Sequence, residues 1–207
     1  MTVPGSACAF FHFTRDRSWG AWPARAILAL ALVVAAAAQW GQAQAADDDV
    51  TLEQRVKAAF LYQFAGYVEW PPNSFAQAGT PVTIAVLGAD SLAAELSQVV
   101  TGRTVGGRQV TVKRVKPGES LAGVHILFIG QAESARLAQL TQTPKPRSIL
   151  TVTESDGALA QGSMINFVLV DRRVRFEVAL DAAEKNGLRL SSRLLAVAQQ
   201  VRTGGTP

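Results

Sequence analysis

The stretch VTIAVLG, residues 82–88, indicates the fold class of the whole chain. It is almost continuously apolar and rich in β-branched residues, which is typical of a strand covered on both faces within a parallel sheet. Three further runs are predicted to be strands: residues 109–115, 124–130 and 148–153. Apolar residues at helical spacing predict helices over residues 92–100 and 134–140. This alternation predicts a single compact α/β domain with a mostly parallel sheet flanked by helices.

The last third of the chain has a different pattern. Residues 164–170 and 173–180 are predicted strands that are joined only by Asp171 and Arg172. This link is too short for a parallel crossover, so the two strands must form an antiparallel hairpin. A short helix is predicted near residues 181–186. Ser191 or Ser192 is expected to cap a final helix. The apolar stripe of that helix comprises Leu194, Val197, Ala198 and Val201.

A long helix is predicted before the first strand and ends by a clear local rule. Pro71 disfavours helical geometry at Trp70, so the helix must stop there. Its predicted buried stripe comprises Val56, Phe60, Phe64 and Tyr67. We expect Phe60, Phe64 and Tyr67 to pack the helix onto the sheet, while Trp70 and Pro71 close a corner of the domain.

Residues 1–45 read as a secretory signal peptide that precedes the domain at residues 46–207. Basic residues stand before AILALALVVAAAA, residues 26–38, which is too short to cross a bilayer comfortably. The small-residue site Ala43-Gln44-Ala45 follows, so we expect cleavage after Ala45 and a periplasmic location. An anchor that is never cleaved is the alternative. After cleavage the protein is not expected to span the membrane.

The composition of residues 46–207 excludes several classes of function. They contain no cysteine, so neither a disulfide nor a cysteine redox switch can form there. The whole chain has a formal charge of +4, and half of this excess lies in the leader. The basic balance is therefore no argument for nucleic-acid binding.

No motif in the chain predicts catalysis, a metal or a cofactor. His125 is the one histidine after the leader, and it lies inside VHILFIG, where a buried core histidine is the expected role. A single histidine with scattered carboxylates is not a zinc cluster. The glycines at 102, 106 and 107 lack the spacing of phosphate loops. We therefore expect a binding protein; an enzyme using His125 would require that residue to be exposed.

Five residues are candidates for a partner-binding surface: Tyr62, Glu69, Trp70, Arg175 and Arg193. They lie off the main stripe of the first helix or among arginines in the last third. Tyrosine, tryptophan and arginine dominate the binding energy of protein interfaces. The alternative is that the aromatic residues are buried and the arginines are merely solvated.

Two long stretches resemble the YfiR family of periplasmic proteins. VKAAFLYQFAGYVEWP, from Val56, resembles the opening signature of the family, and GSMINFVLVDRRVRFEVALDAAEKNGLRLSSRLLAVAQQV, residues 162–201, resembles its closing signature. The matching positions of the second stretch are Ile165, Asn166, Phe167, Arg175, Phe176, Gly187, Leu188, Ser191, Ser192, Arg193 and Leu194. The likeness extends from about Glu53 to Val201.

The resemblance implies a regulator with a compact α/β fold. The best-understood members of the family bind the periplasmic sensor domain of an inner-membrane diguanylate cyclase and hold the cyclase inactive. Release raises cyclic di-GMP, which favours biofilm and exopolysaccharide. Members can dimerise, so a homodimer is an expectation here. They also carry cysteines that form disulfides, and this chain lacks them after the leader.

Two other interpretations stay open. The partner can be a different membrane signalling receptor. The domain can also be a periplasmic small-ligand sensor, because α/β sheets bind ligands at the carboxyl ends of their strands, near Asp90 and Gly130 in this chain.

Substitution of Tyr62 and Arg175 tests the predicted surface. We expect weaker partner binding with little change in the melting temperature, because both side chains are assigned to the surface. Binding measurements and thermal denaturation check this, and variants that unfold would place the two residues in the core.

Overall fold

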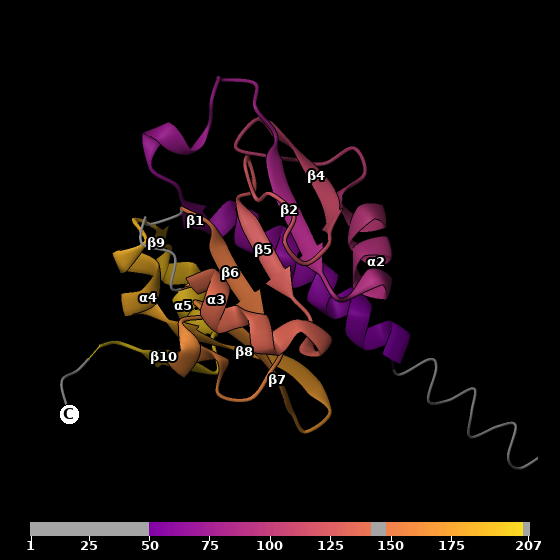
Figure 1. Ribbon diagram of the computed structural model, residues 1–207, viewed down its shortest axis with the longest axis vertical. Coiled ribbons are helices and arrows are strands. Elements are labelled where there is room, and N and C mark those ends of the chain that lie inside the picture. The colour runs from indigo at the N-terminus through magenta and orange to yellow at the C-terminus, as the bar shows by residue number, and fades with distance from the viewer. Residues whose placement is uncertain (1–49, 142–147, 205–207) are drawn as a thin grey trace, which may run out of the picture. The chain divides into compact units, whose positions relative to one another are not determined.

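An eight-stranded sheet runs through the protein in the order β10-β8-β7-β6-β5-β2-β4-β3 (Figure 1). The computed structural model describes residues 50–141 and 148–204. The strands of the sheet are β2 (Val82–Leu87), β3 (Thr104–Val105), β4 (Arg108–Val115), β5 (Ile126–Ile129), β6 (Leu150–Thr153), β7 (Ile165–Val170), β8 (Arg173–Ala179) and β10 (Gln200–Arg202). A separate short pair joins β1 (Val68–Glu69) to β9 (Arg189–Leu190).

Helices connect and cover these strands. The N-terminal helix occupies residues 50–67. The other α-helices are α2 (Asp90–Val100), α3 (Leu137–Thr141), α4 (Leu180–Lys185) and α5 (Ser192–Val197). Three short 3₁₀ segments are η1 (Pro72–Ser74), η2 (Gln131–Arg136) and η3 (Ala158–Gln161).

The strand directions confirm the predicted α/β fold. β4, β2, β5, β6 and β7 are successive parallel neighbours. β7 and β8 form the expected antiparallel hairpin. Asp171 and Arg172 both have left-handed backbone conformations, with φ of 50° and 59°. Two such residues make the hairpin turn whose twist matches that of the strands.

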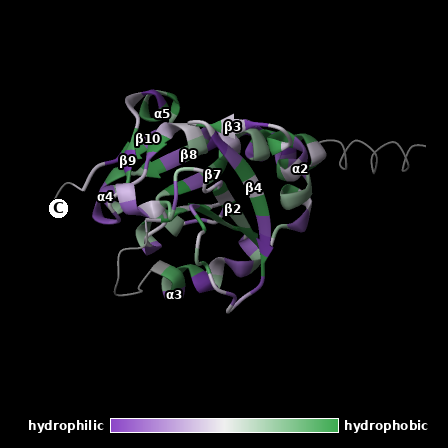
Figure 2. Ribbon diagram, turned by 90° about the horizontal axis from the view of Figure 1, so that it is seen from above, coloured by the Kyte–Doolittle hydropathy of each residue, from purple (hydrophilic) through white to green (hydrophobic). Residues whose placement is uncertain are grey.

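Alternating side chains of the strands supply two cores. Ile84 and Val86 of β2 face the larger core, which the N-terminal helix and α2 complete. Ala85 and Leu87 face a smaller core that includes Leu137 of α3. Figure 1 shows the N-terminal helix (indigo) behind the strands and α3 in front of them. Figure 2 shows β4 banded purple and green, as expected for a strand with alternating burial.

Four phenylalanines join the N-terminal helix to the hairpin. Phe167 of β7 and Phe176 of β8 are direct partners across the hairpin. The ring centroid of Phe64 lies 5.8 Å from that of Phe167 and 5.1 Å from that of Phe176. Phe60 lies 6.1 Å and 5.4 Å from the same two rings. The packing predicted for Phe60 and Phe64 is therefore confirmed.

The buried stripe of this helix is broader than the sequence predicted. Its centre comprises Ala58, Leu61, Phe64 and Ala65, each at most 1% exposed. The predicted positions Val56, Phe60 and Tyr67 form one flank and are half-buried. The larger core, to which α2 also contributes, covers small residues of the helix that the aromatic pattern did not emphasise.

The predicted long C-terminal helix is wrong beyond Val197. α5 ends there, and Gln200–Arg202 form β10, which pairs in parallel with β8. The backbone N–H of Gln199 also donates to the carbonyl of Phe176 at 2.8 Å. The edge of β8 offers unpaired backbone groups, and bonding to them replaces the helical hydrogen bonds that a continuing helix would have made.

Phe64→Ala should show how much the aromatic contact stabilises the fold. We expect a loss of about 3–5 kcal/mol in the free energy of unfolding, because the side chain is fully buried. Urea denaturation measures this loss. Val197→Ala is the control and should change stability by less than about 0.5 kcal/mol, since Val197 is 62% exposed. Equal losses in the two variants would contradict the assignment.

Candidate functional site

His125 is held as a neutral core residue. Its side chain is 2% exposed. Its Nδ1 accepts a hydrogen bond from the Thr83 backbone N–H at 3.1 Å, and its Nε2 lies 3.2 Å from the Ser74 carbonyl, to which it can donate. The ring stacks on Phe75 with centroids 4.4 Å apart. Both ring nitrogens are thus engaged, as the sequence predicted for a core histidine.

The surroundings of His125 oppose its protonation. Burial lowers its pKa; the hydrogen bond with Ser74 raises it in part, and the charge of Arg108 lowers it further. The resulting pKa lies below the ordinary value of 6.5. The imidazole therefore does not offer the exposed, titrating base that a catalytic role would require.

The structure divides the five candidate surface residues among three places. Glu69 lies in β1 and Trp70 follows it, while Arg193 lies in the first turn of α5, just after β9. Because β1 pairs with β9, these three belong to one end of the domain. Trp70 packs its ring edge-on against Phe75 with centroids 6.1 Å apart, which fits the predicted closed corner.

Tyr62 and Arg175 lie apart from that end and from each other. Tyr62 is half-buried on the N-terminal helix, and its hydroxyl donates to the Thr104 carbonyl at 3.2 Å. Arg175 is exposed on β8, in the row that alternates with buried Phe176. Since the N-terminal helix covers the Phe176 row, Tyr62 and Arg175 are on opposite faces of the sheet. Their role in partner binding stays a prediction.

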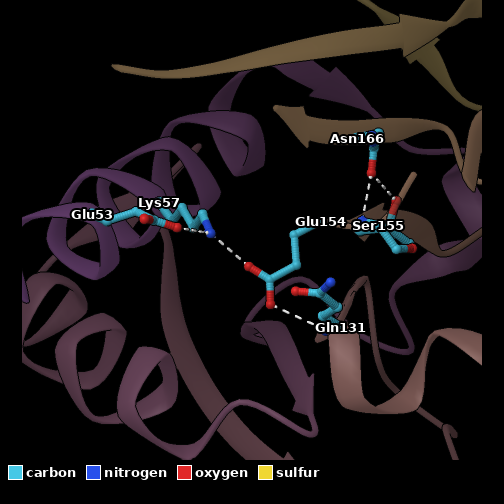
Figure 3. Close-up of polar contacts among 7 residues, drawn as sticks. Glu53, Lys57, Gln131, Glu154, Ser155 and Asn166 are labelled. Atoms are coloured by element: carbon cyan, nitrogen blue, oxygen red, sulfur yellow. Dashed lines mark hydrogen bonds and ion pairs between the residues drawn. The ribbon is translucent and has the colours of Figure 1, made fainter. Parts of the chain in front are cut away.

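A cluster that the sequence analysis did not identify lies where the N-terminal helix meets the carboxyl end of β6 (Figure 3). Lys57 is 5% exposed although it carries a charge. Its Nζ donates to Glu154 Oε2 at 2.6 Å and also to Glu53 on the preceding helical turn. The signal was present in the sequence, because Lys57 precedes the buried Leu61 by one helical turn and follows Glu53 by another.

Glu154 connects this lysine to the ends of two strands. Its second oxygen, Oε1, accepts from the Gln131 backbone N–H at 3.1 Å, just after β5. Next to it, Asn166 Oδ1 accepts from the Thr153 hydroxyl at 2.8 Å and from the Ser155 backbone N–H at 3.2 Å (Figure 3). Asn166 is 4% exposed. These hydrogen bonds hold the turn that carries Glu154, so they orient its carboxylate toward Lys57.

The charged pair is electrostatically well matched. Burial by itself lowers the pKa of Lys57, but its hydrogen bonds and charge interactions with Glu154 and Glu53 outweigh burial. The pKa is therefore raised above its ordinary value of 10.5. The ion pair between Lys57 and Glu154 links the N-terminal helix to the end of β6. The charged atoms of both side chains already have hydrogen-bond partners within the protein.

The crevice expected at the switch point of the sheet is closed. Gly88 and Gly130 follow β2 and β5, the two strands between which the chain order reverses. A Cβ on Gly130 would lie 2.5 Å from the Gly88 carbonyl oxygen, and one on Gly88 would lie 2.6 Å from Glu133 Cγ. The backbone is packed too closely to admit a ligand between these two glycines.

Within residues 50–141 and 148–204, no group of three or more His, Cys, Asp or Glu side chains is arranged to hold a metal ion. No helix in the described part of the chain has the length and apolar character needed to cross a bilayer.

The described residues form an α/β domain in which His125 is buried. The profile of the YfiR/HmsC-like family matches residues 54–199, which is more than half of the chain. The protein therefore belongs to the YfiR/HmsC-like family. At family level it is a periplasmic regulator of diguanylate cyclase signalling. No curated protein matches the chain.

Lys57→Met should destabilise the protein by about 3 kcal/mol or more at neutral pH, because it leaves two carboxylates uncompensated. Arg136→Met is the control: it breaks the more exposed pair with Glu133 and should cost at most about 1 kcal/mol. Chemical denaturation measures both. Adding Glu154→Gln to Lys57→Met should recover part of the loss, and no recovery would contradict the charge argument.

The raised pKa of Lys57 also sets the sign of the alkaline response. The folded protein holds this proton more tightly than the unfolded chain, so the stabilisation is fully present below pH 10.5 and is lost as the pH rises beyond it. Lys57→Met has no such proton to lose, so its free energy of unfolding should fall less steeply than that of wild type above pH 10.5. Chemical denaturation at several alkaline pH values measures the difference.

His125 should make the protein less stable in mild acid. Its folded pKa is depressed, so the unfolded chain takes up a proton that the folded state refuses. We expect the free energy of unfolding to fall below about pH 6.5, by at most about 1.4 kcal/mol per pH unit. His125→Asn should remove this dependence. Denaturation at several pH values checks it, and identical profiles for both proteins would contradict it.

Proposed function

We propose that this protein is exported to the periplasm and there inhibits an inner-membrane diguanylate cyclase. Residues 1–45 would act as the cleaved signal peptide, and residues 46–207 would bind the periplasmic sensor domain of the cyclase. Bound protein would hold the cyclase inactive and lower cyclic di-GMP, and release would favour biofilm formation.

Family membership over residues 54–199 carries this proposal. A role in binding rather than in a reaction is also consistent with the polar side chains of the core. His125 is buried with both ring nitrogens in hydrogen bonds, and Lys57 and Glu154 form an ion pair with each other. The chain has no cysteine after the leader. Release of the partner would therefore depend on competition or on conformational change and not on a thiol switch within these residues.

Deletion of the gene tests the proposal. Cellular cyclic di-GMP should rise, because the cyclase loses its inhibitor, and the exported full chain should restore the low level. A copy that starts at residue 46 after an initiator Met, and so stays in the cytoplasm, is the matched control and should not restore it. Mass spectrometry of cyclic di-GMP measures the response. An unchanged level after deletion, or rescue by the cytoplasmic copy, would overturn the proposal.

A second candidate function, sensing of a small ligand, is favoured by one cavity. It has a volume of about 310 Å³ and is lined by apolar side chains such as Leu127, Ile149 and Met164, with Asp181 and Lys185 also in its wall. A concave site that combines apolar walls with a few polar groups is the usual form of a small-molecule site. This pocket lies away from the closed crevice at Gly88 and Gly130.

A thermal-shift screen separates the two functions. A ligand present at about 100 times its dissociation constant should stabilise the folded state by about 2.7 kcal/mol. Met164→Trp, which fills the cavity, should abolish the shift. Stabilisation that persists in this variant would place the ligand elsewhere.

A further inference from the structure

A groove lies between the first turns of the N-terminal helix and the tip of the β7–β8 hairpin. Its volume is about 430 Å³. The lining residues are Val50, Leu52, Glu53 and Val56 from the helix and Leu169, Arg172, Arg173 and Val174 from the hairpin. The groove thus joins two segments that are more than a hundred residues apart in the sequence.

The groove gathers most of the large apolar side chains that are exposed among the described residues. Four large apolar side chains in this part of the chain are exposed, and three of them, Val50, Leu52 and Leu169, line the groove. Single exposed apolar residues are ordinary on protein surfaces, but a contiguous group marks a site of interaction.

Leu169 shows why this surface is unusual. It lies in the same alternating row of β7 as Ile165 and Phe167, which face the core and are at most 3% exposed. Leu169 nevertheless is 59% exposed. The core-facing side chains of β7 extend beyond the elements that cover Ile165 and Phe167. The last of them, Leu169, is therefore exposed to solvent.

The backbone of the hairpin tip is open as well. β6 pairs with β7 only at Ile165 and Asn166. β10 pairs with β8 only from Glu177 to Ala179. Among the described strands, the three outermost residues of β7 therefore pair only with β8. An added strand could bond to this edge, which is a common mode of peptide recognition.

The charges around the groove favour an acidic partner. Arg172 and Arg173 line it, and Arg173 is exposed at the start of β8. Glu53 is the one acid in the lining, and it is already bonded to Lys57. Arg173 therefore places a positive charge on the rim of the groove, where it can pair with a carboxylate of the partner.

We propose that this groove docks an extended segment of the inner-membrane receptor's periplasmic domain. The segment carries an apolar side chain that fills the hollow beside Leu169 and at least one carboxylate that meets Arg173. This inference rests on the proposed function and specifies the surface that performs it.

Two other occupants fit the surface less well. In a two-fold contact between copies centred on this groove, the Arg173 side chains of both copies would lie near each other, and like charges oppose such a contact. A membrane surface would suit a protruding apolar patch, whereas this surface is hollow. A segment with apolar and acidic side chains satisfies both the shape and the charge.

Direct binding measurements test the groove. The protein is produced from the full chain and recovered from the periplasm. The probes are the purified periplasmic domains of the inner-membrane diguanylate cyclases of the same organism. For the domain that wild type binds, Leu169→Gln should weaken the affinity by about fivefold or more, which is the least loss expected for a residue that contributes substantially to an interface. Leu52→Gln repeats the test on the helix side of the groove.

Matched variants separate the groove from general effects. Val197→Gln changes an apolar residue that is also exposed, at 62%, but lies on α5, and it should leave the affinity unchanged. Arg173→Glu should weaken binding and make it less sensitive to salt, whereas Arg202→Glu on β10 should not. Thermal denaturation checks that all the variants fold; the affected residues are exposed, so their melting temperatures should stay close to that of wild type.

Each alternative outcome is distinct. If wild type binds a cyclase domain and the groove variants bind it equally well, the groove inference is overturned while the proposed function stands. If wild type binds none of the domains, the proposed function fails and the inference with it. Light scattering that shows a dimer lost in Leu169→Gln would assign the groove to a second copy. Binding to anionic vesicles that is lost in the same variant would assign it to the membrane. Either result would overturn the proposal.

Discussion

The contact between the N-terminal helix and the β7–β8 hairpin is the interaction on which the rest of the structure depends. Phe60 and Phe64 pack against Phe167 and Phe176 and so fix the helix over the antiparallel end of the sheet. Burial of this much aromatic surface contributes strongly to the stability of the fold. It also explains why the chain carries so many aromatic residues before Pro71.

This hydrophobic contact leaves the orientation of the helix to be fixed by polar groups. Lys57 bonds to Glu154 at the carboxyl end of the parallel strands, and Asn166 holds the turn beside it. Apolar packing is non-directional, while hydrogen bonds to charged groups depend on geometry. The two kinds of interaction together determine where the first helical turns lie relative to the hairpin, and the groove at Leu169 is a consequence of that placement.

A regulator that acts by binding needs a stable folded domain and a surface whose apolar and backbone groups remain available to a partner. Here the domain uses its histidine and its buried lysine internally, so these groups stabilise the fold and are not offered to a ligand. The hairpin tip differs because its core-facing row and part of its backbone edge are open. Exposed groups of this kind do not stabilise the isolated domain. Their burial by a partner would instead contribute to the free energy of binding.

The sequence by itself determined the alternation of strands and helices, the parallel sheet, the two-residue hairpin and the core role of His125, because these follow from local periodicity and chain connectivity. It could not place Gln200–Arg202 in the sheet, since that strand forms only because the edge of β8 is available. Nor could it bring Lys57 to Glu154 or Leu52 to Leu169. The residues of each pair are distant in the chain, and only the tertiary packing of the helix on the sheet and hairpin brought them to one place.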